Sequence, residues 1–522
     1  MLRFASRRLL GALCCTALGG ALAASPAAAQ PAARPATGSR FVADSLDAYV
    51  QRGLRLWQIP GLAVVVVKDG QVVVSKGYGV RAVGRPEPVD GNTQFLIASN
   101  SKLFTGTALA QLEQEKKLSL NDPATKYLPD FRLYDPVSTQ LVTVRDLLGH
   151  HLGTKTFQGD FTFWSSNLSR EEILQRVRLL KPSAPFRQDY GYCNAGFLAA
   201  GQIIPAVTGG TTWEAYVEQT LLKPLGMSNT SMLTAGVAQH PNVALPYSNA
   251  YGPLTALPYD QVDNLGPAAS MVSCVNDLGK WLQFQLDSGK VQGRPVLPWA
   301  TLRRTRDVNT ALSARKSPLL PEHFRTYGLG VFAADYNGRQ VFWHTGGANG
   351  FVSNTCFVPE EGLGIAVLTN QDNQSFFEAL RYQLLDAYLG MPYTDRSRQL
   401  WKRAAPFQAE TKADIEKLNA RVAKKAKPEL PLKAYAGQYT HPLYGLITIE
   451  AQGKQLVVRF SHHPALTAAL AYMDGQQFRT TYSNIAYGIF PATFTVEGGQ
   501  VKAVELRVND GIEQDPYVFT RG

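Results

Sequence analysis

The sequence has few cysteines, no metal-binding spacing and, apart from AKKAKP near Lys424, no dense run of basic residues. Its 522 residues include five cysteines and eight histidines. The pairs His150-His151 and His462-His463 are adjacent, whereas metal ligands on one helix stand three or four residues apart. The formal charge is +11, but Lys and Arg are spread along the chain rather than gathered beside aromatic residues. The sequence therefore predicts no metal, no cofactor and no nucleic-acid partner.

Long apolar runs are also rare, and one lies within the first 29 residues. A basic start that includes Arg7-Arg8 precedes LLGALCCTALGGALA, which is too short to span a bilayer, and the small residues Ala27-Ala28-Ala29 follow. We expect a bacterial cleavable signal peptide over 1–29, for the Sec route or, given Arg7-Arg8, the twin-arginine route. A membrane anchor fits less well, because a Pro/Ala-rich tether (30–40) follows directly. No later run is apolar enough to be transmembrane, so we expect a periplasmic or secreted protein.

Removal of the leader would leave three cysteines, Cys193, Cys274 and Cys356. An oxidising compartment permits one disulfide among them. The sequence leaves open whether any two of them pair.

The order of helical and strand patterns indicates how the larger part of the chain is organised. Two apolar β runs joined by Asp69-Gly70 predict a hairpin, and further strands recur over 340–370. Amphipathic patterns predict helices at both ends of this region and a helical subdomain inside it (41–57, 376–389 and about 122–263). We therefore expect an α/β domain over 41–395, with a mainly antiparallel sheet flanked by helices.

The C-terminal part has a different texture. Residues 396–431 are rich in charge and end in KKAKPELP, which indicates a charged linker. From 432 to 522, short alternating strands such as LITIEA and QLVVRF are separated by turns. This pattern predicts a separate small all-β domain, either a barrel or a sandwich.

The first chemical motif is the S-x-x-K spacing of Ser99 and Lys102 at the start of an apolar helix. Residues three apart share one helix face, so the amine can reach the hydroxyl. A lysine shielded from water can lose its proton near neutral pH and act as a base for the serine. Ordinary helix capping, with Lys102 pointing outward, explains the same four residues when they are taken alone.

The second motif is Tyr192-Cys193-Asn194, just before a helix with apolar spacing. A tyrosine hydroxyl can relay protons, and an asparagine amide can hold both a substrate carbonyl and the lysine. Taken alone, the motif also fits a loop aromatic and a helix cap. Cys193 has no paired histidine in sequence, which favours a packing role for it.

The third motif is His344-Thr345-Gly346-Gly347 at the end of an apolar strand. The two glycines allow another backbone to come close. A substrate could pair with this strand edge, and the N–H groups of Gly347 and Ser99 could form an oxyanion hole. A β-turn with an incidental histidine is the simpler alternative.

In the order S-x-x-K, Y-x-N and H-T-G, the three motifs together resemble the serine β-lactamase and penicillin-binding-protein superfamily, specifically its β-lactamase-related (CubicO-type) peptidases and esterases. Other matching stretches are IPGLAVVVVKDGQVVVSKGYG, LSLNDPATKYLPDF, TVRDLLGHHLG, LLKPLGMSNTSM and MVSCVNDLGKWLQF. The resemblance covers about 41–389. Residues 432–522 resemble the lipocalin-like β domain of some members. The family implies an α/β sandwich with a helical subdomain and the active site between them.

The resemblance also implies a role for each motif residue. Ser99 would be the acylated nucleophile and Lys102 the base that activates it. Tyr192 would relay a proton to the leaving group, or serve as the base for the hydrolytic water, and Asn194 would position the substrate carbonyl. No cofactor is implied.

Position 344 departs from the β-lactamase pattern. Lysine usually occupies it, in K-T-G, and holds the carboxylate of the antibiotic. His344 is a weaker anchor because histidine is mostly neutral at pH 7, and histidine here resembles D-amino-acid peptidases and some esterases. Leu152 stands where the family usually has a hydroxyl, which we attribute to local packing.

These observations predict a serine hydrolase that acts through an acyl-enzyme on small peptides, including ones with D-residues, or on esters. The alternatives are a true β-lactamase and a catalytically silent binding or sensor protein of the same fold. The expected partner is a small-molecule or peptide substrate. The sequence leaves open the exact substrate, the role of the β domain, and whether copies of the chain associate through it.

Overall fold

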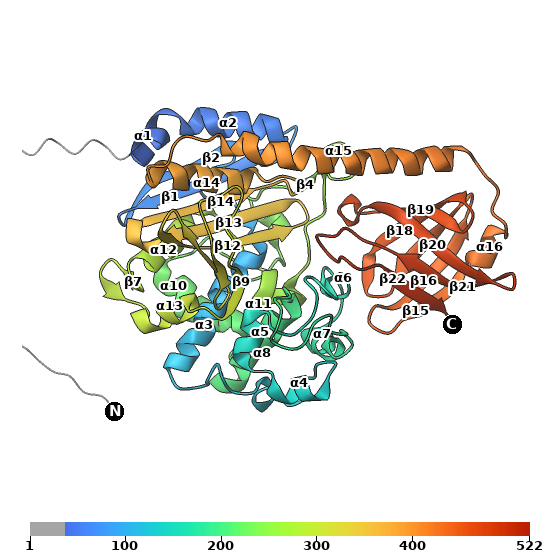
Figure 1. The fold of residues 1–522 in the computed structure, drawn as a ribbon, viewed down its shortest axis with the longest axis horizontal. Helices are drawn as coiled ribbons and strands as arrows, with labels where there is room; N and C mark the ends of the chain where they lie inside the picture. The colour runs from blue at the N-terminus through green and yellow to red at the C-terminus, as the bar shows by residue number, and fades with distance from the viewer. Residues whose placement is uncertain (1–36) are drawn as a thin grey trace, which may run out of the picture.

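The computed structural model describes residues 37–522, which form an antiparallel sheet between helices, a helical part and a C-terminal barrel (Figure 1). The expected α/β fold class with a following all-β unit is confirmed. The predicted leader and most of the tether lie outside the described residues. Within 37–522, no helix is both long enough and apolar enough to cross a bilayer.

The main sheet has eight antiparallel strands in the order β2-β1-β14-β13-β12-β11-β10-β9. They are β1 (Gly61–Lys68), β2 (Gln71–Gly79), β9 (Thr310–Ser313), β10 (Arg325–Tyr327), β11 (Phe332–Tyr336), β12 (Arg339–Ala348), β13 (Phe351–Val358) and β14 (Leu363–Thr369). As expected, Asp69 and Gly70 make the β1–β2 turn, and both have positive φ angles, 50° and 77°.

Both faces of the sheet are covered, which explains the unbroken apolar sequence of β1. Leu62, Val64 and Val66 point to one face and Ala63, Val65 and Val67 to the other, and all six are buried. The first face packs under α2 (Leu46–Trp57) and α14 (Phe376–Tyr388), with α1 (Thr37–Asp44) beside α14. The second face packs against α12 (Val275–Leu286).

The helical part lies below the sheet in Figure 1 and surrounds α3 (Ser101–Gln114). Eleven of the fourteen residues of α3 are buried, because three helices pack around it: α8 (Asn194–Thr208), α11 (Gly266–Ala269) and α13 (Trp299–Arg306). The other helices of this part are α4 (Pro136–Leu141), α5 (Val144–Gly149), α6 (Asp160–Phe163), α7 (Arg170–Val177), α8 (Asn194–Thr208), α9 (Trp213–Val217), α10 (Lys223–Leu225), α11 (Gly266–Ala269) and α13 (Trp299–Arg306). Short two-residue strands are β3 (Phe95–Leu96), β4 (Tyr247–Ser248), β5 (Thr255–Ala256), β6 (Val272–Ser273), β7 (Lys290–Val291) and β8 (Arg294–Pro295).

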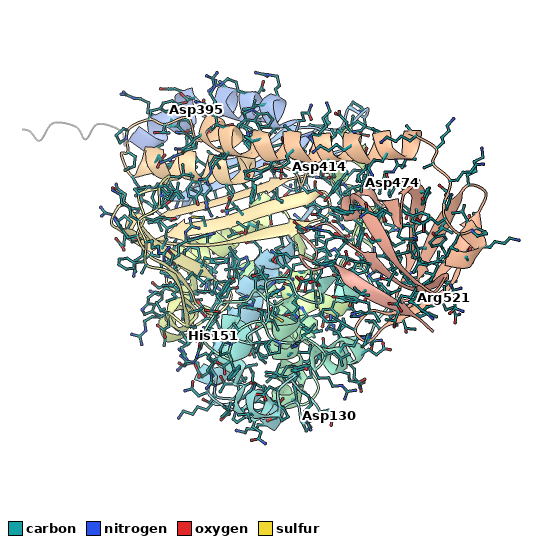
Figure 2. The ribbon with its side chains drawn as sticks, turned by 45° about the vertical axis from the view of Figure 1, so that its right-hand side comes forward. Asp130, His151, Asp395, Asp414, Asp474 and Arg521 are labelled. Carbon is teal, nitrogen blue, oxygen red and sulfur yellow. The ribbon has the colours of Figure 1, made fainter. Side chains whose placement is uncertain are left out.

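The segment expected to be a charged linker contains a 28-residue helix, α15 (Arg396–Ala423). The helix runs from the sheet domain to the barrel (Figure 1), and Figure 2 labels Asp395 where it begins and Asp474 on the barrel. At its first turn, the Nε of Arg396 donates to Asp386 of α14 over 2.6 Å in a buried ion pair. At its last turn, Arg421 binds both carboxylate oxygens of Asp474. The helix is therefore tied to a different unit at each end.

The C-terminal unit is a closed antiparallel barrel, so the sandwich alternative is excluded. A short helix, α16 (Leu432–Tyr435), precedes it. Its strands are β15 (Gly437–His441), β16 (Gly445–Gln452), β17 (Gln455–Phe460), β18 (His463–Asp474), β19 (Gln477–Tyr482), β20 (Ile489–Glu497), β21 (Gln500–Leu506) and β22 (Tyr517–Arg521). The barrel closes where Tyr439 and Thr440 pair with Arg521 and Thr520.

Cys193, Cys274 and Cys356 are all buried and all free. No disulfide therefore forms among the cysteines of residues 37–522, and each thiol packs as a small apolar side chain.

Candidate active site

Ser99 and Lys102 lie at the point where the chain turns from β3 into α3. A short 3₁₀ turn (Ala98–Asn100) leads directly into the helix. Ala98 has a φ of 46°, a left-handed conformation that non-glycine residues rarely adopt and that is frequent beside functional residues. This turn presents Ser99 at the mouth of the helix, and the Nζ of Lys102 lies 3.0 Å from its Oγ.

Lys102 is fully buried, and its three hydrogen bonds match a neutral amine. Its Nζ donates to Asn194 Oδ1 over 2.6 Å and to the carbonyl of Ala268 over 2.8 Å. Both partners can only accept, so they use the two N–H bonds of a neutral amine and leave its lone pair for the Ser99 hydroxyl. Burial lowers the pKa of Lys102 to about 7, against the opposing charge of Asp160.

Tyr192 closes the site on the side of α8. The Lys102 Nζ lies 4.7 Å from the centre of its ring, and its hydroxyl is hydrogen-bonded with Ser99. Burial raises the pKa of Tyr192 well above its usual value, although the Ser99 contact opposes this. The phenol therefore stays protonated at neutral pH, which fits a proton relay better than a free base.

Asn194 links Lys102 to a carboxyl group that the sequence motifs did not include. Its Nδ2 donates to Asp160 Oδ2 over 2.5 Å, while its Oδ1 accepts from Lys102. Asp160 is buried, and burial raises its pKa to about 7. Its Oδ1 has no hydrogen-bond partner among the described residues. A single acidic residue within the aromatic stretch FQGDFTFW was the one available sequence signal.

His344 is held in one neutral form. Its Nδ1 lies 2.6 Å from the carbonyl of Thr345, which can only accept, so the ring proton is on Nδ1. Its Nε2 then accepts from the hydroxyl of Tyr327 over 3.1 Å. Burial, with the nearby Lys102 charge, lowers the pKa of His344 to about 3. An uncharged imidazole supplies no positive charge for a substrate carboxylate.

The Gly346-Gly347 pair allows the end of β12 to lie against the 3₁₀ turn that carries Ser99. A Cβ at Gly346 would lie 2.0 Å from the carbonyl oxygen of Ile97, so only glycine permits this approach. At Gly347 a side chain would meet nothing, and this residue lines the cavity with Ser99 and Thr345. Strand β12 pairs with β11 only as far as Trp343. Beyond Trp343, the side of β12 that faces β11 has no strand partner within the described sheet.

His150 is a second residue that the motifs did not single out. It is completely buried, and its ring stacks on that of Tyr192 with centroids 4.3 Å apart. Its Nδ1 accepts the backbone N–H of Cys193 over 3.0 Å, so it supports the Tyr192 loop. The stretch TVRDLLGHHLG carries this residue, which the sequence alone shows only as part of an adjacent histidine pair.

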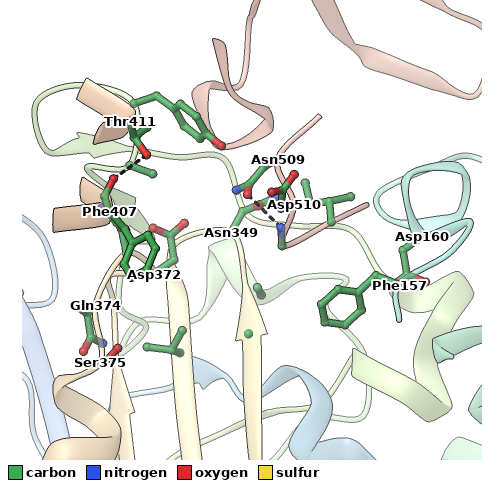
Figure 3. Close-up of a pocket in the computed structure, with 18 of the residues that line it drawn as sticks. Phe157, Asp160, Asn349, Asp372, Gln374, Ser375, Phe407, Thr411, Asn509 and Asp510 are labelled. Carbon is green, nitrogen blue, oxygen red and sulfur yellow. Dashed lines mark hydrogen bonds between the residues drawn. The ribbon is translucent and has the colours of Figure 1, made fainter. Parts of the chain in front are cut away.

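Ser99 opens into a cavity of about 1250 Å³ that extends well beyond the motif residues. Figure 3 shows Phe157 and Asp160 on one side, Phe407 and Thr411 of α15 on another, and Asn509 and Asp510 of the barrel. Three parts of the chain thus share one cavity. No cluster of His, Cys, Asp and Glu in residues 37–522 could hold a metal ion.

Known families and proteins resemble the chain over most of its length. The model of the Beta-lactamase family matches residues 46–389, and that of a domain of unknown function, DUF3471, matches residues 421–521. Unguisins hydrolase ungD of Aspergillus violaceofuscus is 27% identical over 514 residues, 90% of this chain and 88% of that protein. Protein flp of Staphylococcus aureus is 27% identical over 338 residues, 63% of each chain.

Two solved structures share the fold. The octameric penicillin-binding protein homologue from Pyrococcus abyssi aligns with a TM-score of 0.59 and 21% identity, over 92% of this chain and 100% of its own. The D-stereospecific amidohydrolase from Streptomyces sp. aligns with a TM-score of 0.51 and 24% identity, over 64% of this chain and 94% of its own.

Proposed function

Because the chain belongs to the Beta-lactamase family, a family of hydrolases, we propose that it is a serine hydrolase that works through an acyl-enzyme on small peptides or esters. The observation that carries the proposal is the Lys102 Nζ, which is fully buried, lies 3.0 Å from Ser99 Oγ and has its other two hydrogen bonds on obligate acceptors. This is the arrangement that a neutral lysine needs in order to accept a proton from a serine.

In the acylation step, Lys102 takes the hydroxyl proton of Ser99 as Oγ attacks the carbonyl carbon of the substrate. The N–H groups of Ser99 and Gly347 stabilise the negative charge on the carbonyl oxygen. The tetrahedral intermediate then expels the amine or alcohol, which receives the proton of Lys102 through the Tyr192 hydroxyl. The enzyme is left as a Ser99 ester.

In the deacylation step, water attacks this ester and gives a proton to the Tyr192 hydroxyl, which passes its own proton to the neutral amine of Lys102. The second tetrahedral intermediate collapses to the acid product, and the proton returns to Ser99 Oγ. Asn194 keeps Lys102 in place in both steps and offers its amide to the substrate carbonyl.

Peptides or esters fit the site better than β-lactam antibiotics. The neutral His344 stands where a lysine would hold the carboxylate of an antibiotic. The names of two similar proteins fit this proposal: one is a hydrolase of unguisins, and the other is a D-stereospecific amidohydrolase. The large cavity leaves room for a substrate of several residues.

The central test is covalent labelling. A serine-directed phosphonate should add to the wild-type protein, and intact-mass and peptide spectrometry should place the adduct on Ser99. Ser99→Ala should show neither labelling nor turnover, whereas Ser101→Ala should keep its labelling site. A Ser99→Ala protein with full activity contradicts the proposal.

A panel of substrates separates the alternatives. D- and L-aminoacyl amides, dipeptides and p-nitrophenyl esters should be turned over faster than nitrocefin. Efficient nitrocefin hydrolysis would favour a β-lactamase instead. Absence of any adduct at high probe concentration would favour a binding or sensor protein.

The leader and the domain division are part of the same proposal. A signal peptide over 1–29 would export the protein to the periplasm or medium, and N-terminal sequencing of the secreted form should begin near Gln30. The domains would be 41–395 and 432–522, with 396–431 between them. The octameric homologue suggests assembly of several copies, which light scattering would measure.

A further inference from the structure

The four-residue helix α6 is inserted into the mouth of the barrel. The ring of Phe161 lies between His463, with centroids 4.7 Å apart and planes 4° apart, and Tyr517, at 5.6 Å and 11°. Phe161 is only 2% exposed. Figure 1 shows α6 at the side of the helical part that faces the barrel. All five ring contacts of Phe161 are made with side chains of the barrel unit.

The barrel also holds the backbone on both sides of α6. Glu513 accepts the N–H of Gly159 over 2.5 Å, immediately before the helix. The ring of His463 donates its Nε2 proton to the carbonyl of Trp164 over 3.1 Å, immediately after it. Burial lowers the pKa of His463 to about 4, so the ring stays neutral and keeps this donor in place. The helix is thus fixed at its start, its middle and its end by another domain.

Asp160 lies between these anchor points and faces the catalytic centre. Its Oδ2 accepts from Asn194, and Asn194 in turn accepts from Lys102. A continuous set of contacts thus runs from Glu513 of the barrel through Gly159, Asp160 and Asn194 to the amine.

The charged and titratable groups around Asp160 come from several elements. The positive charge of Lys102, on α3, lowers the pKa of Asp160. The negative charge of Asp160 in turn raises the pKa values of four groups: Tyr192 and Cys193 before α8, and Tyr444 and Glu513 of the barrel.

We propose that the C-terminal barrel is a positioning part of the active site, which fixes α6 and thereby sets the direction and protonation of Lys102 through Asp160 and Asn194. This inference rests on the proposed function, in which Lys102 is the base. Asp160, Phe161 and Glu513 are positioning residues, because they act through Asn194. The barrel then contributes to the chemical step itself, in addition to forming one wall of the cavity.

Loss of the barrel contacts to α6 should displace the base. Asp160 would no longer orient the Asn194 amide, and Lys102 would lose an aligned acceptor and a nearby negative charge. Misplacement of a catalytic group by about 1 Å costs about 100-fold in rate. The loss should appear in kcat even for a substrate too small to reach the barrel, because the base itself moves.

The experiment measures full-length variants with the smallest p-nitrophenyl ester that the wild type hydrolyses. Phe161→Ala should lower kcat about 10- to 100-fold with KM within about twofold, and should change the pH at which activity rises. Asp515→Asn is the matched control, because it removes the exposed Lys155–Asp515 ion pair between the same two units, while Asp515 makes no direct contact with α6 and only a small contribution to the pKa of Glu513. It should stay within about twofold of the wild type.

A second pair of variants guards against misfolding of Phe161→Ala. Glu513→Gln retains an oxygen that accepts the Gly159 N–H, whereas Glu513→Leu does not. We expect Glu513→Leu to have a kcat about tenfold below that of Glu513→Gln, with both variants folded by near-UV circular dichroism.

The outcomes are distinct. If the wild type and Ser99→Ala behave as predicted above but Phe161→Ala and Glu513→Leu keep the wild-type kcat and pH profile, the barrel does not position the base and the inference is wrong. If KM for long substrates is the only quantity that changes, the barrel lines the cavity without positioning the base, which also overturns the inference. If the wild type is never labelled at Ser99, it is the proposed function that fails.

Discussion

At the inner end of the cavity Lys102 is 0% exposed and His344 1%, whereas Phe407 at the outer end is 70% exposed. The inner side chains come from the sheet and helical part, and their polar atoms are held by short hydrogen bonds. The outer wall comes from α15 and the barrel. Burial fixes orientation and shifts pKa values, while exposure leaves a surface that can vary. We infer that the inner end determines the reaction and the outer end determines which substrates reach it.

Removal of the Lys102 amine is the sharpest test of whether the inner end determines the reaction. Lys102→Ala should lower kcat/KM about 10²- to 10⁴-fold for every substrate, because the hydroxyl of Tyr192, which also contacts Ser99, stays protonated and cannot replace the amine as base. Steady-state kinetics on short and long substrates measure the change. Lys117→Ala, an exposed lysine just beyond the same helix, is the control and should leave kcat/KM unchanged. Equal losses in the two variants would contradict the role of Lys102.

The pH profile of kcat/KM is the next test of the inner end. The base must be neutral, so activity should be present above pH 7, the approximate pKa of Lys102, and should fall as the pH drops through it. Asp160 raises the pKa of Lys102 by its negative charge, so Asp160→Asn should move the rise in activity to lower pH. The amide oxygen of the variant still accepts from Asn194. An unchanged profile would mean that the charge of Asp160 does not reach the base.

A change at the outer end should affect substrates according to their length. Phe407→Ser removes an exposed apolar side chain from the α15 wall. We expect KM to rise about three- to tenfold for long apolar peptides, which corresponds to roughly 1 kcal/mol of lost contact, and kcat for short esters to stay unchanged. Phe324→Ser, at another exposed phenylalanine, is the control. A fall in kcat on short esters would show that the two ends are not separable.

The smallest effect is expected on stability, at the contact between the two units. Burial raises the pKa of Glu513 to about 8, so the folded protein holds this proton where the unfolded chain releases it. The stability from the protonated group is complete below its unfolded pKa and is lost as the pH rises through about 8. Glu513→Gln removes this dependence. Calorimetry should therefore show that the Tm of the variant minus the Tm of the wild type rises by a few degrees between about pH 5 and pH 8.

The contact between the Lys102 amine and the Ser99 hydroxyl could be predicted from the sequence because its signals are local, whereas the catalytic roles of the motif residues stay predictions. Ser99 and Lys102 are three residues apart on one helix, and Tyr192 and Asn194 flank the start of another. The turn at Asp69-Gly70 is equally local. For such features, spacing and residue type determine the geometry.

Features that depend on contacts between distant segments could not be predicted in this way. The alternating pattern of 432–522 fits a barrel and a sandwich equally, and closure depends on pairing between its first and last strands, as at Thr440 and Thr520. The hydrogen bond of Gly159, the residue before Asp160, to Glu513 joins two segments that lie 354 residues apart in the chain. The charge of α15 indicated a linker, because most of its surface faces solvent.

The helix α15 has a consequence for the size of substrate that can be hydrolysed. At 1.5 Å per residue, its 28 residues form a rod about 42 Å long, anchored to the sheet domain by Arg396 and to the barrel by Arg421. Because α15 is tied to the structure at both ends, we expect it to swing aside less readily than a flap held at one end. We expect the enzyme to degrade fragments that thread in by one end and to spare intact folded proteins.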